Sequence, residues 1–148
     1  MPFKRNLQRY AAELGELRAL KELLLGENKL TGVTKELGEL AALKVLDLHS
    51  NKLTTVPPEL GKLDGLTTLN LSNNQLTGLP PEIGGLTALE ELELEENHLA
   101  SVPPELGDLA ALKALNLDGN PRLKRVPKEL AKLKNVNLPP DTAGLSTS

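Results

Sequence analysis

Five asparagines recur along this chain at a constant interval, each 23 residues after the one before. Each closes the pattern L-x-x-L-x-L-x-x-N, as in LKVLDLHSN, which ends at Asn51. A fixed interval of this size, with leucines at fixed offsets, predicts a stack of small units, because no single unit can bury its apolar side alone. The five residues are Asn28, Asn51, Asn74, Asn97 and Asn120.

The second half of the interval is also regular, reading KLTTVPPELGKL from Lys52, QLTGLPPEIGGL from Gln75 and HLASVPPELGDL from His98. Together the two halves resemble leucine-rich repeats of the 23-residue class, found in Ras-suppressor-like, plant intracellular and bacterial proteins. The resemblance covers roughly residues 6–138. It implies an α/β solenoid, a horseshoe arc with a parallel concave β-sheet and short 3₁₀ or helical turns on the convex side. Because the family is defined by its scaffold, the resemblance names no partner.

Alternation with period two predicts a short strand in each unit. In Val45-Leu46-Asp47-Leu48-His49 the leucines are expected to face inward and the other residues outward. Each recurring asparagine then stands where the strand turns away, and its amide can bond to backbone groups that the turn leaves unpaired. We therefore expect the five asparagines to form a buried polar ladder.

Prolines and glycines punctuate the rest of each unit. A proline has a preset φ that suits the first turn of a helix, so short turns are expected after the proline pairs at 57–58, 80–81 and 103–104. Glycine recurs at one position of the repeat, and we interpret it as the residue that closes each turn. These glycines are Gly38, Gly61, Gly84 and Gly107.

We expect three regions along the chain. Residues 1–19 are predicted to be an N-terminal half-repeat cap, helical because apolar residues recur there at intervals of three and four. Residues 20–133 hold the five repeats. Residues 134–148 are predicted to be a C-terminal cap strand near 135–138 followed by a frayed tail. Pro121 follows Asn120, and the apolar residues after it come one position later than the period predicts.

Composition restricts the function. The formal net charge is −3, so charge alone indicates neither nucleic acid nor a membrane surface. The aromatic residues Phe3 and Tyr10 fall outside the outward strand positions, which leaves no platform there for stacking bases. The chain has no cysteine and no apolar run long enough for a signal peptide or a membrane span. A cytoplasmic, monomeric protein without a cofactor is therefore expected.

The outward strand positions are the candidate site. A curved solenoid presents its sheet as an extended surface, so a protein partner is expected on the concave face. Glu91, Glu93 and Glu95, here called the acidic patch, project from one face, and no Lys or Arg occurs between Lys62 and Lys113. The acidic patch suits a basic segment of a partner, although a merely solvated face is the alternative. The expected partner-binding residues are Asp47, His49, Asn70, Glu91, Glu93, Glu95, Asn116 and Asp118.

Other chemistries fit less well. His49, Ser72 and Asp47 are the residue types of a hydrolase triad, and neighbouring strands could place His49 near Ser72. Asp47 is expected to lie further along its own strand rather than behind the imidazole, and no oxyanion motif accompanies Ser72, so no enzymatic activity is predicted. A calcium site built from the acidic patch and Asp118 is disfavoured, because long glutamates on an open sheet are poorly preorganised.

The last repeat is basic. We interpret its cations as a solubilising cap; an anionic partner, or head-to-tail packing against the acidic patch of another copy, is the alternative. Two further interpretations of the whole chain stay open. One is a structural or engineered, consensus-like repeat scaffold without an evolved ligand, and the other is the repeat fragment of a larger signalling protein. The basic residues are Arg122, Lys124, Arg125, Lys128, Lys132 and Lys134.

Overall fold

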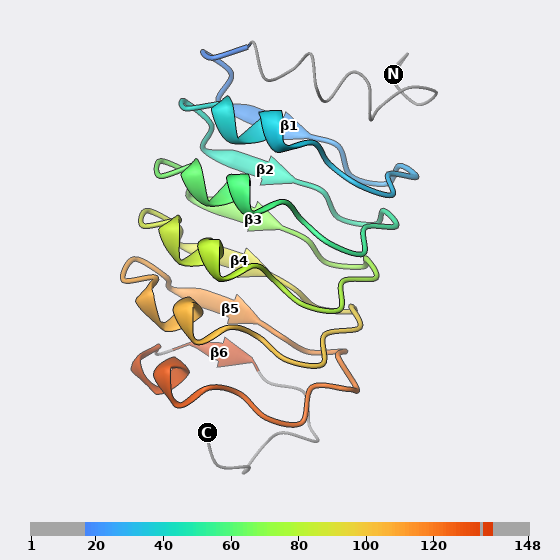
Figure 1. Ribbon diagram of the computed structural model, residues 1–148, viewed down its shortest axis with the longest axis vertical. Coiled ribbons are helices and arrows are strands. Elements are labelled where there is room, and N and C mark those ends of the chain that lie inside the picture. The colour runs from blue at the N-terminus through green and yellow to red at the C-terminus, as the bar shows by residue number, and fades with distance from the viewer. Residues whose placement is uncertain (1–16, 134, 138–148) are drawn as a thin grey trace.

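The computed structural model describes residues 17–133 and 135–137. In this part the chain coils into a stack in which a short strand on one side alternates with a 3₁₀ helix on the other (Figure 1). The predicted solenoid is confirmed. The helical cap predicted for residues 1–19 falls almost wholly outside the described residues, as does the tail from residue 138 onward.

The concave side is one parallel sheet of six strands that follow each other in sequence order. The first five pair at a constant step of 23 residues, so that Leu46 lies opposite Leu69 and Leu69 opposite Leu92. The last step is shorter, because Leu115 lies opposite Val136. The strands are β1 (Glu22–Leu24), β2 (Val45–Asp47), β3 (Thr68–Asn70), β4 (Glu91–Glu93), β5 (Ala114–Asn116) and β6 (Val136–Asn137).

The convex side consists of 3₁₀ helices of five residues each. Helices η2 to η4 begin at the second proline of a pair, as the preset φ of proline predicts. Leucines from both sides fill the space between strands and helices, and Leu46 and Leu48 are fully buried. The helices are η1 (Lys35–Glu39), η2 (Pro58–Lys62), η3 (Pro81–Gly85), η4 (Pro104–Asp108) and η5 (Lys128–Lys132).

The recurring glycines are needed for close packing, and their interpretation as turn closers is wrong. Gly38, Gly61, Gly84 and Gly107 all lie inside the 3₁₀ helices, and none has a positive φ. A Cβ added at Gly61 would lie 2.1 Å from the carbonyl oxygen of Glu82 in the next helix. Glycine thus lets successive 3₁₀ helices approach each other. In η5, on which no further helix stacks among the described residues, Ala131 takes this position.

The recurring asparagines lie between successive coils. The Nδ2 group of Asn74 donates to the carbonyl of Leu71 in its own repeat and to that of Leu48 in the preceding one, at 3.1 and 3.0 Å. Its Oδ1 accepts from the N–H of Leu53 at 3.0 Å. Asn28, in the first repeat, is partly exposed and donates to two carbonyls of its own repeat. The arrangement of Asn74 recurs at Asn51, Asn97 and Asn120.

Candidate partner-binding surface

The outward strand positions form columns across the concave face. The register places Asp47 beside Asn70, Asn70 beside Glu93 and Glu93 beside Asn116. A second column runs along the outward residues that begin each strand and includes Glu91. Neighbours within a column are therefore separated by the ordinary spacing of paired strands, about 4.8 Å. The candidate residues of strands β2 to β5 share one continuous face.

Three of the candidate residues also have a structural task. The Oδ1 atom of Asp47 accepts the backbone N–H of the residue two positions later at 3.0 Å, and Asn70 and Asn116 do the same at 3.0 and 3.1 Å. This local bond pairs a backbone group at the point where the strand ends. This structural role was not predicted, although Asp or Asn recurs at one position of the repeat in the sequence.

Ser72 does not face the solvent as its place in the repeat suggests. Its side chain is buried, and its hydroxyl donates to Oδ1 of Asn70 at 2.7 Å. A serine is short enough to fold beneath its neighbour once the strand has ended, and a buried hydroxyl requires a partner. The open face between β3 and the turn that follows is thus formed by Asn70 rather than by Ser72.

The imidazole of His49 lies between the carboxylate of Asp47 in its own repeat and that of Glu27 in the first repeat. Its Nδ1 lies 2.6 Å from Oδ1 of Asp47, and its Nε2 lies 3.9 Å from Oε1 of Glu27. The expectation that Asp47 lies away from the imidazole is wrong, because residues two apart on an extended segment share a face. The ring covers Gly26, where an added Cβ would lie 2.2 Å from its Cε1 atom.

This placement brings Asp47 and His49 together but leaves Ser72 apart from them. The imidazole of His49 is turned toward the first repeat, whereas Ser72 belongs to the third and uses its hydroxyl in a bond to Asn70. A serine nucleophile needs its hydroxyl within reach of the imidazole. The three residue types of a Ser–His–Asp triad occur in the sequence, but the structure does not arrange them as one.

The acidic patch lies on β4 and in the turn that follows. Glu91 is exposed, and Glu93 and Glu95 are half-buried. Burial of the carboxyl raises the pKa of Glu93 above its ordinary value of 4.5, and the charges of Glu95 and Glu91 raise it further. A hydrogen bond from Asn116 opposes the rise. Three carboxylates thus share a small area in which the two outer ones disfavour ionisation of the central one.

The residues around the acidic patch differ in the contacts that their side chains make. Asn116 on β5 donates from Nδ2 to Oε2 of Glu95, which joins the two residues across the strands. Asp118 is exposed at the rim. Glu90 lies next to the patch, but its carboxylate forms an ion pair with Lys113 at 3.3 Å. The nearest cation in the sequence after the patch is therefore already matched to a different carboxylate.

A large exposed apolar residue, Leu24, lies on the concave face and was not among the predicted site residues. Leu24 on β1 occupies the column of Asp47, and 58% of its surface is exposed. The signal was a leucine at a position where other repeats have Asp, Asn or Glu. Large exposed apolar residues often contact partners, but a single one is also common on ordinary surfaces.

The part of the chain that the structure describes forms neither a metal-binding cluster nor a membrane-spanning helix. Over residues 17–133 and 135–137, no three His, Cys, Asp or Glu side chains gather in a way that could hold a metal ion. The acidic patch is included in this result, so its carboxylates do not converge on a common point. In the same part of the chain, no helix has the length and apolar character needed to cross a membrane.

Comparison with known families agrees with the architecture. The family model described as a leucine-rich repeat region matches residues 4–133. The chain belongs to the leucine-rich-repeat family. The leucine-rich repeat is commonly a protein-interaction module, and curved solenoids of this kind offer their concave surfaces for binding. A search of curated protein sequences found no significant match for this leucine-rich-repeat chain.

Solved structures of the same family are similar to this chain. A leucine-rich-repeat protein of Leptospira interrogans is 40% identical, with a TM-score of 0.80 over 85% of this chain and 33% of that one. The plant peptide hormone receptor RGFR1 in complex with RGF2 is 37% identical, with a TM-score of 0.73 over 82% and 20%. The SOBIR1 receptor-kinase ectodomain of Arabidopsis thaliana is 27% identical, with a TM-score of 0.68 over 79% and 68%. This chain spans 33% and 20% of the first two proteins.

Proposed function

We propose that this leucine-rich-repeat chain is a non-enzymatic module that binds a basic segment of a partner protein on its concave sheet, around β4. Glu93 is the observation that carries the proposal. In the second, third and fifth repeats an Asp or Asn stands at this position and bonds to the following turn. A glutamate here does not make that local hydrogen bond, and its pKa is raised first by burial and then by the charges of Glu95 and Glu91. A residue that local structure does not favour is a candidate for function.

The charge around the acidic patch supports a basic partner. No Lys or Arg lies between Lys62 and Lys113, and Lys113 is paired with Glu90. A Lys or Arg side chain placed over β4 would relieve the repulsion among the carboxylates and lower the pKa of Glu93 back toward its ordinary value. Aligned carboxylates on a rigid surface also speed the approach of a cation, and salt weakens this effect.

Relatives of known structure support a peptide-like ligand. RGFR1, which is similar to this chain, was solved in complex with RGF2. An extended basic peptide laid across the strands would meet the acidic patch and the exposed Leu24 on one face. Assignment to the 23-residue class and a cytoplasmic location belong to the same proposal, and they are supported by the constant interval and the absence of cysteine.

The proposal is tested with a fluorescein-labelled peptide of alternating lysine and alanine, whose binding is followed by fluorescence anisotropy. The triple variant Glu91→Lys, Glu93→Lys, Glu95→Lys is expected to bind at least about tenfold more weakly than the parent. The matched control is Glu39→Lys, Glu82→Lys, Asp108→Lys, which has the same net charge but changes exposed residues of the convex helices. The binding affinity of this control variant for the peptide is expected to fall much less than that of the triple variant of the acidic patch.

Two results would refute the proposal. Equal loss in both triple variants would mean that the peptide responds only to net charge. No binding of the peptide to the parent at low ionic strength, where surface electrostatics are strongest, would favour the scaffold without a ligand.

A further inference from the structure

The fifth repeat departs from the earlier ones at Pro121, just after its asparagine of the ladder. After Asn51, Asn74 and Asn97, the next residue donates its N–H to the preceding coil, as Gln75 does to Leu53 and His98 to Leu76, at 2.8 and 2.9 Å. Pro121 occupies the equivalent position in the fifth repeat and has no N–H to donate. The buried Leu123 then lies 24 residues after the buried Leu99, one more than the regular step.

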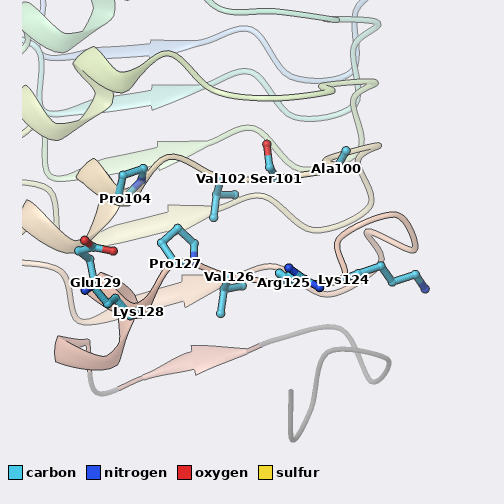
Figure 2. Close-up of a pocket in the computed structure, with 10 residues that line it drawn as sticks. All are labelled: Ala100, Ser101, Val102, Pro104, Lys124, Arg125, Val126, Pro127, Lys128 and Glu129. Atoms are coloured by element: carbon cyan, nitrogen blue, oxygen red, sulfur yellow. The ribbon is translucent and has the colours of Figure 1, made fainter. Parts of the chain in front are cut away.

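A groove of about 590 Å³ lies between these two coils. Its walls are the segments that lead from β4 into η4 and from β5 into η5. Figure 2 shows Lys124 and Arg125 at one end of the groove and Lys128 with Glu129 at the other. A volume of this size is within the range of ligand pockets, about 300–1,000 Å³. Apart from Ser101, the rest of the lining is apolar and comes from Ala100, Val102, Pro104, Val126 and Pro127.

The two walls of the groove differ in charge. Lys124, Arg125 and Lys128 are exposed and belong to one wall, together with the single carboxylate of Glu129. The facing wall, from Ala100 to Pro104, contributes no charged residue to the lining. Cations spread along an apolar channel match a ligand that has carboxylates at intervals and apolar side chains between them.

We propose that this groove binds an extended acidic peptide segment of a partner protein. The apolar floor would receive the peptide's aliphatic side chains, and Arg125 and Lys128 would pair with its carboxylates. Arg in particular can bind a carboxylate through two parallel hydrogen bonds. The proposal does not depend on the acidic patch of β4, because the ligand has the opposite charge and the groove lies outside the strands. A polyanion such as nucleic acid fits less well, because the groove lining contains no aromatic side chain on which bases could stack.

The test measures anisotropy of a fluorescein-labelled peptide of alternating glutamate and valine. The double variant Arg125→Glu, Lys128→Glu is expected to bind about tenfold more weakly than the parent, whereas Lys29→Glu, Lys52→Glu, with the same net charge, is expected to stay within about twofold. Ala100→Trp narrows the groove without changing charge and is expected to weaken binding about fivefold. Urea unfolding verifies that each variant is folded.

Several outcomes would overturn the proposal. The peptide with glutamine in place of glutamate must bind far more weakly, and equal binding would remove the role of charge. Equal loss in the two double variants would indicate a diffuse electrostatic effect, and unchanged binding in Ala100→Trp would remove the groove itself. A thymidine oligonucleotide of equal charge that binds more tightly than the peptide would favour nucleic acid. No binding to the parent at low ionic strength would also reject the site.

Discussion

Replacing Asn74 by alanine is a quantitative test of the asparagine ladder, because the structure shows which backbone groups would be left without a hydrogen bond. Three carbonyls accept from the Asn74 amide, and each has a second donor. The carbonyl of Leu48 also accepts from Asn51 at 3.0 Å, and that of Leu71 also accepts from Asn97 at 2.9 Å. The third carbonyl, that of Ser72, also accepts the backbone N–H of Ser50 at 2.9 Å. The carbonyls therefore remain paired in the variant.

The N–H of Leu53 does not have this protection. It donates to Oδ1 of Asn74 at 3.0 Å, and Leu53 is fully buried. A buried donor left without a partner costs about 1–3 kcal/mol. Asn74→Ala is therefore expected to lose about 1–3 kcal/mol of unfolding free energy. If the four bonds of the side chain contributed independently at about 1 kcal/mol each, the loss would instead be about 4 kcal/mol.

Urea unfolding followed by circular dichroism measures this difference. The midpoint of Asn74→Ala is expected to fall with an unchanged slope, and Tm is expected to fall by about 2–4 °C for each kcal/mol. Gln75→Ala is the control, because Gln75 is exposed and its backbone bond to Leu53 does not involve the side chain. A midpoint equal to that of the parent would refute the ladder, and a loss of about 4 kcal/mol or more would refute the sharing of carbonyls.

Two further predictions concern the packing of the helices and the acidic patch. Gly61→Ala is expected to cost about 1–3 kcal/mol in urea unfolding, because its Cβ would meet the Glu82 carbonyl. Gly78→Ala, with open space around the new Cβ, is expected to be neutral or slightly stabilising, and equal effects would reject the packing role. For Glu93 the folded-state pKa lies above the ordinary 4.5, so the folded state holds the proton more tightly than the unfolded state does. Ionised Glu93 therefore destabilises the fold above its folded-state pKa, and this cost disappears as the pH falls through that pKa toward 4.5. Glu93→Gln is expected to unfold at higher urea than the parent at neutral pH, with the difference closing on acidification, and a difference that grows on acidification would contradict the sign.

The architecture was predictable because it depends on intervals. Alternation within Val45-Leu46-Asp47-Leu48-His49 assigned the inward leucines, and the proline pairs located the starts of three helices. Both signals are local, and the repeat multiplies each of them. The displaced leucine after Pro121 likewise pointed to an irregular last coil. The groove between the last two coils was not predictable, because a one-residue shift fixes the chain length but not the separation of the walls.

Contacts between neighbouring repeats were harder to predict. The sequence does not distinguish a Gly61 that closes a turn from a Gly61 that lets a carbonyl approach. The close approach of the Glu82 carbonyl in the next helix shows that the second role is the right one. Glu27, Ser50 and Glu96 have positive φ directly before an asparagine of the ladder, although their residue types do not favour it. Asn73 and Gly119 stand at the same position, and their residue types do favour it. The turn of His49 toward Gly26 depends on space left by a missing side chain in another repeat.

Amide chemical-shift mapping of the isotopically labelled parent protein, titrated with the peptide of alternating lysine and alanine, tests the concave-surface proposal most directly. The largest shifts are predicted in β4, β5 and the turns that follow them, from Glu91 to Glu96 and from Ala114 to Asp118. Smaller shifts are expected in the convex helices. Largest shifts in η2 to η4, or shifts spread evenly over both sides, would contradict the assignment of the concave sheet as the binding surface.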